Sequence, residues 1–201
     1  MILVFGFVIA AFVGGTMFMS LAFQGSRNIP QHATILPQAA ALPRFSLLDQ
    51  NGAEFNNESL NDQWSLIFFG FTHCPDICPA TLQQLAIARG RVLDQGERSF
   101  PSIVLISVDP ERDTPEVLAE YIGHFGDGMT GVTGSIDELR KLTSALGIFF
   151  EKSAGENGNY SVDHSAVVIV INKNAEFHAL FSAPHTIDHF VGDMPLITES
   201  T

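Results

Sequence analysis

The sequence predicts an α/β sandwich that follows an apolar N-terminal segment. Three observations carry this prediction. Uncharged runs rich in β-branched and aromatic residues recur along the chain, as is typical of buried strands. Segments with the apolar spacing of amphipathic helices separate these runs. Turn signals for a β-hairpin stand near both ends of the predicted folded part.

The N-terminal segment, residues 2–23, contains no charged side chain. A helix of roughly 20 apolar residues spans the hydrocarbon core of a bilayer, so we predict a transmembrane helix here. A cleaved signal peptide and a buried core helix are the alternatives, the first because small residues stand near the end of the segment. Residues 24–42, which include Pro30 and Pro37, are predicted to form a tether, and residues 43–195 the folded domain.

The charge balance excludes one class of partner. The chain of 201 residues has 22 acidic and 10 basic side chains and a formal net charge of −12. Surfaces that bind DNA or RNA need clusters of basic residues, so no nucleic-acid partner is expected. An acidic surface keeps a domain soluble and attracts basic protein partners.

The first half of the folded domain is predicted as hairpin, strand, helix and strand. Asn51-Gly52 stands between two short apolar runs, which is a strong signal for a β-hairpin. "WSLIFFGFT" and "SIVLISVD" are continuous apolar runs of strand length, and the segment between them has helical spacing. These elements are expected over residues 45–55, 64–72, 78–93 and 102–109.

The second half is predicted as two helices, a strand pair and a last helix. The first helix opens at Asp113 or Thr114, with Pro115 in its first turn. The second is capped by Ser135 and stopped by Gly147. The strands flank a turn at 173–174, and the elements are expected over residues 113–125, 135–147, 166–181 and 186–194. A thioredoxin-like domain has this order of elements.

The only two cysteines, Cys74 and Cys78, stand in "CPDIC" between a predicted strand and a predicted helix. Pro79 suits the first helical position, so Cys78 is expected at the N-cap, and Pro75 biases Cys74 toward an extended backbone. The positive end of the helix dipole favours thiolates, the reactive and metal-binding form. A disulfide, a metal site and a redox-active pair all remain open from this segment alone.

A metal site would need a third ligand, and His164 is the best placed of the seven histidines. It directly precedes a buried run, and the thioredoxin order places that strand beside the strand that leads to the cysteines. Asp163 either orients the His164 ring or caps a turn. His73 is expected to point away from Cys74, because neighbouring side chains diverge in extended backbone. A Cys-Cys-His set suits Cu(I), accepts Cu(II) and can also hold zinc.

Five segments resemble those of one known family, in the same order: "LPRFSLLDQNG", "FFGFTHCPDICP", "SVDPERDTPEVLAEYI", "GVTGS" and "YSVDHSA". They span roughly residues 33–190 and are similar to the Sco/SenC copper proteins. The resemblance implies a thioredoxin-like fold, an N-terminal transmembrane helix, and a domain on the outer (periplasmic) face of the inner membrane. It also implies one copper ion, with Cys74, Cys78 and His164 as its ligands.

The resemblance further implies a metallochaperone that delivers copper to the copper A site of cytochrome c oxidase during assembly. The oxidase subunit that carries this site is the expected partner, and other copper chaperones are further candidates. The alternative is an enzyme: a membrane-anchored thiol-disulfide oxidoreductase that uses Cys74 and Cys78 to keep oxidase cysteines reduced. Asp109 in "SVDPERDTP" is interpreted as part of a structural turn and is left out of the site.

Overall fold

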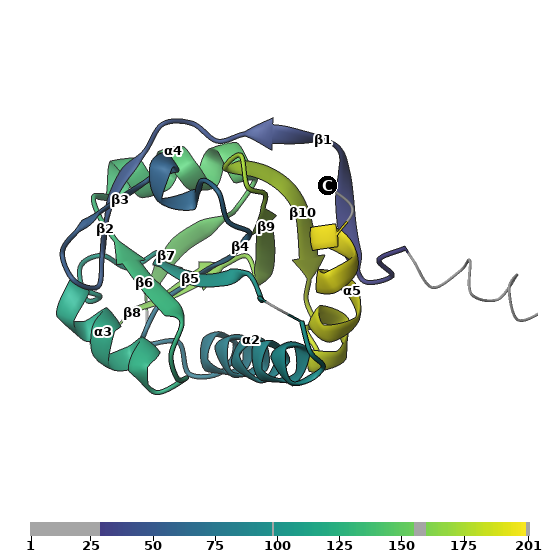
Figure 1. The fold of residues 1–201 in the computed structure, drawn as a ribbon. Coiled ribbons are helices and arrows are strands. Elements are labelled where there is room, and N and C mark those ends of the chain that lie inside the picture. Colours follow the sequence, from purple (N-terminus) through teal and green to yellow (C-terminus); the bar gives the residue numbers. More distant parts are fainter. Residues whose placement is uncertain (1–28, 98, 155–159, 200–201) are drawn as a thin grey trace, which may run out of the picture.

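The computed structural model describes residues 29–97, 99–154 and 160–199, which form a mixed eight-stranded sheet and a second, two-stranded one (Figure 1). The strand order in the large sheet is β1-β10-β9-β4-β5-β6-β2-β3. Its strands are β1 (Ala33–Ala41), β2 (Ser46–Asp49), β3 (Glu54–Asn56), β4 (Ser65–Gly70), β5 (Ser102–Ser107), β6 (Met129–Thr133), β9 (Val167–Ile171) and β10 (Glu176–Ser182). The small sheet is a hairpin of β7 (Phe150–Ala154) and β8 (Tyr160–His164).

The centre of the large sheet consists of strands that the sequence predicts as buried. β4 runs parallel to β5, and β5 runs parallel to β6. Parallel neighbours need a crossover connection, which α2 (Ile77–Asp94) and α3 (Pro115–Gly123) provide. β9 pairs with the other side of β4 in the antiparallel direction, with Val168 opposite Phe68. The predicted α/β sandwich and both predicted hairpins, β2–β3 and β9–β10, are confirmed.

Helices cover both faces of this sheet. α4 (Ile136–Leu146) lies on the opposite side from α2 and α3, and α5 (Ile187–Glu199) packs beside α2 (Figure 1). A short 3₁₀-helix, η1 (Asn57–Leu60), follows β3. Thr114 and Ser135 cap α3 and α4 by accepting the backbone N–H three residues later, and Gly147 ends α4 with a φ of 67°. The predicted caps are therefore confirmed.

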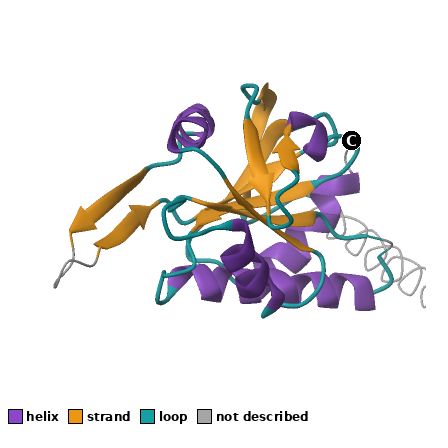
Figure 2. Ribbon diagram, turned by 90° about the vertical axis from the view of Figure 1, so that its left-hand side faces the viewer, coloured by secondary structure: helices purple, strands orange, loops and turns teal. Residues whose placement is uncertain are grey.

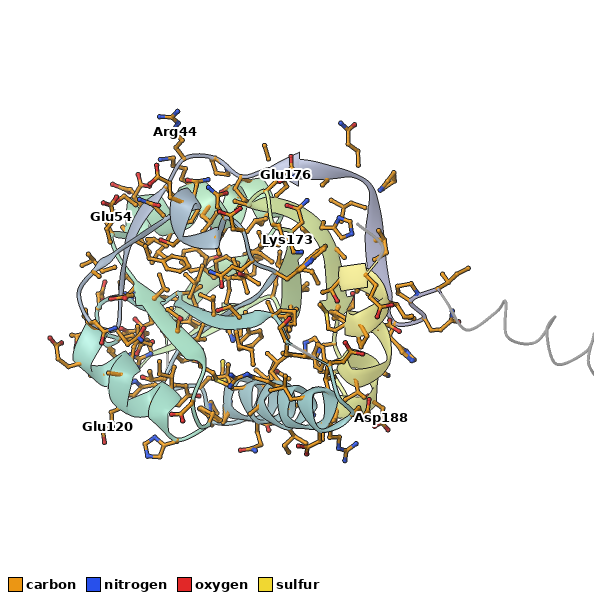
Figure 3. The ribbon with its side chains drawn as sticks, viewed as in Figure 1. Arg44, Glu54, Glu120, Lys173, Glu176 and Asp188 are labelled. Atoms are coloured by element: carbon orange, nitrogen blue, oxygen red, sulfur yellow. The ribbon has the colours of Figure 1, made fainter. Side chains whose placement is uncertain are left out.

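The interior is apolar, and most charged side chains lie at the periphery. β4 is buried along its whole length, and the core continues through β5, β9 and the inner faces of the helices. Figure 3 shows Arg44, Glu54, Glu120 and Asp188 at the outside of the ribbon. Among the described residues, three carboxylates are buried instead, and each accepts hydrogen bonds from more than one donor: Asp109, Asp113 and Asp193.

Residues 33–41 were predicted to be part of a tether, but they form β1 and pair with β10. The segment lacks the period-2 pattern of a half-buried strand and contains Pro37, which together favour an irregular chain. β1 is an edge strand, where a proline is tolerated, and its pairing register shifts between Ile35 and Ala40, around that proline. Ordered structure thus begins before Pro43.

Three further strands were not predicted. β6 is short and contains a glycine, so its apolar signal is weak. β7 and β8 are largely exposed, and no continuous apolar run marks them. Figure 2 shows the β7–β8 hairpin at its left, extending away from the large sheet.

The predicted transmembrane helix at residues 2–23 lies outside the described residues. Among the helices that the structure describes, none combines the length and the apolar character needed to cross a membrane.

Candidate metal site

Three elements bring Cys74, Cys78 and His164 together. Cys74 lies in the loop after β4, Cys78 in the first turn of α2, and His164 at the end of β8. β9 begins three residues after His164 and pairs with β4. The pairing of these two central strands therefore places the end of β8 beside the loop that carries Cys74.

The start of α2 differs from the prediction. The N-cap is Asp76 and the helix begins at Ile77, so Cys78 lies within the helix and Pro79 occupies its third position. The first N–H groups of a helix have no intrahelical partner, so a proline in the first turn removes no hydrogen bond. Cys78 itself donates its free N–H to the Sγ of Cys74 over 3.4 Å.

The three candidate ligand atoms form a tight group. The Sγ of Cys78 lies 3.3 Å from the Nε2 of His164, and all three ligand atoms lie within 4.8 Å of one another. Both cysteines are free thiols; Cys78 is fully buried and Cys74 is 9% exposed. Within the part of the chain that the structure describes, this is the one group of three or more His, Cys, Asp or Glu side chains with such spacing.

The ring of His164 is oriented by its surroundings. Its Nδ1 lies 3.2 Å from the carbonyl oxygen of Ser165, which only accepts hydrogen bonds. With Nδ1 donating to this carbonyl, Nε2 faces the sulfurs and is the nitrogen that can coordinate a metal ion. The ring also stands edge-on to Phe68 and Phe71, with centroid distances of 5.9 Å and 5.7 Å.

The two thiols differ in acidity. A hydrogen bond from Cys78 lowers the pKa of Cys74 to about 3, helped by His164 and by backbone N–H groups and opposed by burial. The same interaction and the deeper burial raise the pKa of Cys78. The pair therefore holds one thiolate, on Cys74, and one thiol, on Cys78, at neutral pH.

Gly70 and Asp113 shape the backbone around the sulfurs. A Cβ at Gly70 would lie only 2.9 Å from the Sγ of Cys78, so the end of β4 needs a glycine for this close approach. Buried Asp113 accepts hydrogen bonds from the N–H and the hydroxyl of Thr72 at 3.0 and 2.6 Å, which holds the loop before Cys74. The sequence suggested Asp113 only as a possible cap of α3, a role that Thr114 takes.

The remaining candidates of the sequence analysis stay outside the site. His73 is exposed and lies near Thr72 and Asp113, so the prediction that it points away from the sulfurs is confirmed. Asp163 is exposed and its side chain makes no hydrogen bond within the described residues, so the carbonyl of Ser165 orients the ring instead. The other five histidines lie elsewhere and contact groups outside the site: His32, His124, His178, His185 and His189.

The donor set fits a soft metal ion. Two sulfurs and one imidazole nitrogen match the preferences of copper, and thiolates in particular select Cu(I). A structural zinc site takes four protein ligands, and the described residues offer three at this place. Three ligands leave a coordination position open for an incoming group.

Comparison with known proteins decides the family. The sequence profile described as SCO1/SenC matches residues 34–197. This chain belongs to the SCO1/SenC family. A relative from Stutzerimonas stutzeri, whose name refers to copper binding, is 35% identical over 182 residues, covering 90% of this chain and 89% of its own length. The SCO2-like protein RP587 of Rickettsia prowazekii is 40% identical over 135 residues, covering 66% and 65% of the two chains.

Solved structures of SCO proteins share the fold. Copper-bound ScoI of Arabidopsis thaliana is 33% identical, with a TM-score of 0.74 over 80% of this chain and 99% of that one. Copper-bound ScoI of Bradyrhizobium japonicum is 32% identical, with a TM-score of 0.66 over 78% and 98% of the two chains. The predicted thioredoxin-like α/β fold of the SCO proteins is thereby confirmed for this chain.

Proposed function

We propose that this protein is a copper metallochaperone that binds one copper ion through Cys74, Cys78 and His164. The observation that carries the proposal is the group of two thiol sulfurs and one imidazole nitrogen within 4.8 Å of one another. It occurs in a chain of the SCO1/SenC family, whose relatives in Arabidopsis and Bradyrhizobium are described with copper bound. Copper is the cargo of such a protein.

The copper is delivered by ligand exchange to the copper A site of cytochrome c oxidase during assembly. The subunit that carries this site is the receiving partner, and other copper chaperones supply the ion. Cys78 is fully buried, whereas Cys74 and His164 are partly accessible, so a partner's thiolate or imidazole approaches from their side. The open coordination position admits that ligand before a protein ligand leaves, so free copper need not be released.

The location proposed for this activity is the outer face of the inner membrane. Residues 2–23 act as a single transmembrane anchor, and the segment between them and β1 connects it to the domain. The absence of charge in residues 2–23 supports this assignment, as does the resemblance to anchored Sco proteins.

Copper titration of the purified protein and of a His164→Ala variant tests the ligand set. We expect the Cu(II) affinity to fall at least about tenfold in His164→Ala, because even the groups that orient a metal ligand contribute roughly 10- to 100-fold. The Cu(II) electron paramagnetic resonance spectrum should lose its imidazole nitrogen coupling. His73→Ala is the matched control, since His73 adjoins Cys74 in sequence but stays outside the site. Unchanged Cu(II) affinity in His164→Ala would contradict a three-ligand site.

A thiol-disulfide oxidoreductase is the second candidate, favoured by the adjacent free thiols and by the lowered pKa of Cys74. Here the Cys74 thiolate attacks a disulfide of the oxidase subunit, Cys78 resolves the mixed disulfide, and the client regains two thiols as Cys74 and Cys78 become a disulfide. His164 is not needed for this exchange. The oxidoreductase is favoured if His164→Ala loses copper delivery but still reduces an oxidised copper A fragment at the wild-type rate and still supports assembly of an active oxidase.

A further inference from the structure

A cluster of three side chains ties the β7–β8 hairpin to the loop after β5. The hydroxyl of Tyr160, at the start of β8, donates to Asp109 over 2.7 Å. Arg112 forms an ion pair with the other oxygen of Asp109 and donates to the carbonyl of Tyr160 over 3.2 Å. Its guanidinium stacks on the Tyr160 ring, 3.8 Å from the centroid. Each member of the Asp109–Arg112–Tyr160 cluster thus contacts both others.

The cluster is continuous with the metal site on two sides. The guanidinium of Arg112 also lies 5.8 Å from the ring centroid of Phe71, and that ring stands edge-on to His164 at 5.7 Å. Along β8, Tyr160 and His164 lie four residues apart and therefore point to the same face of the strand. Arg112 is consequently linked to His164 both through Phe71 and through the strand.

The orientation of His164 depends on how this hairpin is held. In the described part of the chain, β7 and β8 pair only with each other and with no strand of the large sheet. At the base of the hairpin, Ser165 donates its N–H to the carbonyl of Phe149 over 2.9 Å. Farther out, the hairpin meets the loop after β5 through the Tyr160 cluster and through an ion pair of Lys152 with Glu111. Side chains, rather than a backbone ladder, fix the hairpin against the domain.

We propose that Asp109, Arg112 and Tyr160 form a latch that positions His164 over the cysteine pair. The latch thereby sets the affinity of the site for Cu(II) relative to its affinity for Cu(I). The latch residues touch no copper ligand atom and are positioning residues. This inference rests on the proposed copper site. Two thiolates alone satisfy Cu(I), whereas Cu(II) gains more from an imidazole nitrogen. A hairpin released from the latch leaves Cu(I) bound to the sulfurs and loses mainly Cu(II) affinity.

Tyr160→Phe and Arg112→Lys test the latch. Tyr160→Phe keeps the ring and its packing and removes only the hydrogen bond to Asp109. Arg112→Lys keeps the positive charge and removes the planar contact with both rings. Arg140→Lys is the matched control, because Arg140 lies on α4 and makes no ion pair or ring contact within the described residues. All proteins are titrated separately with Cu(I) and Cu(II), and the potential of the bound couple is measured.

The latch predicts a selective change. In Tyr160→Phe and Arg112→Lys, Cu(II) affinity falls about tenfold, as is typical for groups that orient a metal ligand, while Cu(I) affinity stays unchanged. The potential then rises by about 59 mV for each tenfold change in the ratio of the two affinities. In the metal-free protein, amide hydrogen exchange of residues 160–164 accelerates in both variants and not in Arg140→Lys. This readout requires no copper.

Several outcomes overturn the latch while leaving the copper site intact. Equal losses of Cu(I) and Cu(II) affinity would mean that the cluster supports the fold without acting selectively on Cu(II) binding. Wild-type affinities in both variants, or wild-type exchange in residues 160–164, would show that the hairpin is held without it. A wild-type protein whose Cu(II) spectrum lacks imidazole coupling contradicts the proposed copper site itself, and the latch with it.

Discussion

At the scale of single residues, the two cysteines are chemically unequal. The hydrogen bond from Cys78 is the largest cause of the lowered pKa of Cys74, and it raises the pKa of Cys78 in turn. The deeper sulfur keeps the proton because it is fully buried and lies next to a thiolate. At neutral pH the metal-free pair therefore carries one negative charge, on the more accessible sulfur.

This inequality predicts the proton balance of copper binding. Metal ligands must be deprotonated, so Cu(I) binding at pH 7 should release about one proton, from Cys78, rather than two. At and above pH 7, copper affinity should then fall about tenfold for each unit of decrease in pH, because one proton competes with the ion. Calorimetric titration in buffers of different ionisation enthalpy measures the number of protons released. Release of two protons would show that Cys74 is a thiol in the free protein.

At the scale of elements, the first ordered segment of the domain is held by one buried carboxylate. Asp193 of α5 is 2% exposed and accepts the N–H groups of Gln31, His32 and Ala33 at 2.6–3.0 Å. The ring of His32 also stacks on His189 of the same helix. These contacts attach the start of β1 to α5, where neither hydrophobic pattern nor turn chemistry marks a strand.

Asp193→Ala should detach the start of β1. Removing the acceptor of several backbone N–H groups is expected to lower the free energy of unfolding by about 1–3 kcal/mol. Amide exchange of residues 31–41 should accelerate, with copper affinity unchanged. Asp188→Ala is the control on the same helix, because Asp188 is 86% exposed and its ion pair with Arg91 contributes little. Equal stability of the two variants would refute the anchoring role of Asp193.

The elements also show where sequence patterns succeed. Central strands and capped helices were predicted because their signals are local: continuous apolar runs, Thr114 and Ser135 at helix starts, and Gly147 at a helix end. The sequence did not predict β1, β6 and the β7–β8 hairpin, because these strands depend on pairing partners that no window of neighbouring residues contains. The predicted N-cap of α2 was wrong by two positions, since a proline fits anywhere in the first helical turn.

At the scale of the whole molecule, one sheet organises both the core and the site. The end of β4 carries the cysteine loop, and its neighbours β5 and β9 carry the loop of the latch and the connection to His164. The cysteine loop, the loop after β5 and the residues before β9 are far apart in the sequence. They meet at the edge of the sheet where β4 and β5 end and β9 begins. α/β proteins commonly place ligand sites at such an edge.

The extent of this unit can be tested with two fragments. A fragment that begins at Ile29 retains β1, whereas one that begins at Pro43, the predicted start of the domain, exposes the edge of β10. We expect the shorter fragment to melt roughly 5 °C or more below the longer one, because it loses a full strand pairing, and to aggregate more readily. Thermal unfolding by circular dichroism measures the difference. Equal melting temperatures would mean that β1 does not contribute to stability.

The sequence by itself determined the alternation of strands and helices, the caps of α3 and α4, and the pair of sulfurs in "CPDIC", because each depends on residues close together in the chain. It also singled out His164, but only through the order of elements expected of the fold. The tertiary structure alone decided that the Cys78 sulfur and the His164 ring, 86 residues apart, lie 3.3 Å from each other. It alone revealed β1, the hairpin and the contacts of Arg112 with Tyr160. These long-range contacts form only when β9 pairs with β4. Pairing between strands that are distant in the chain produces no periodic pattern in the sequence of either strand.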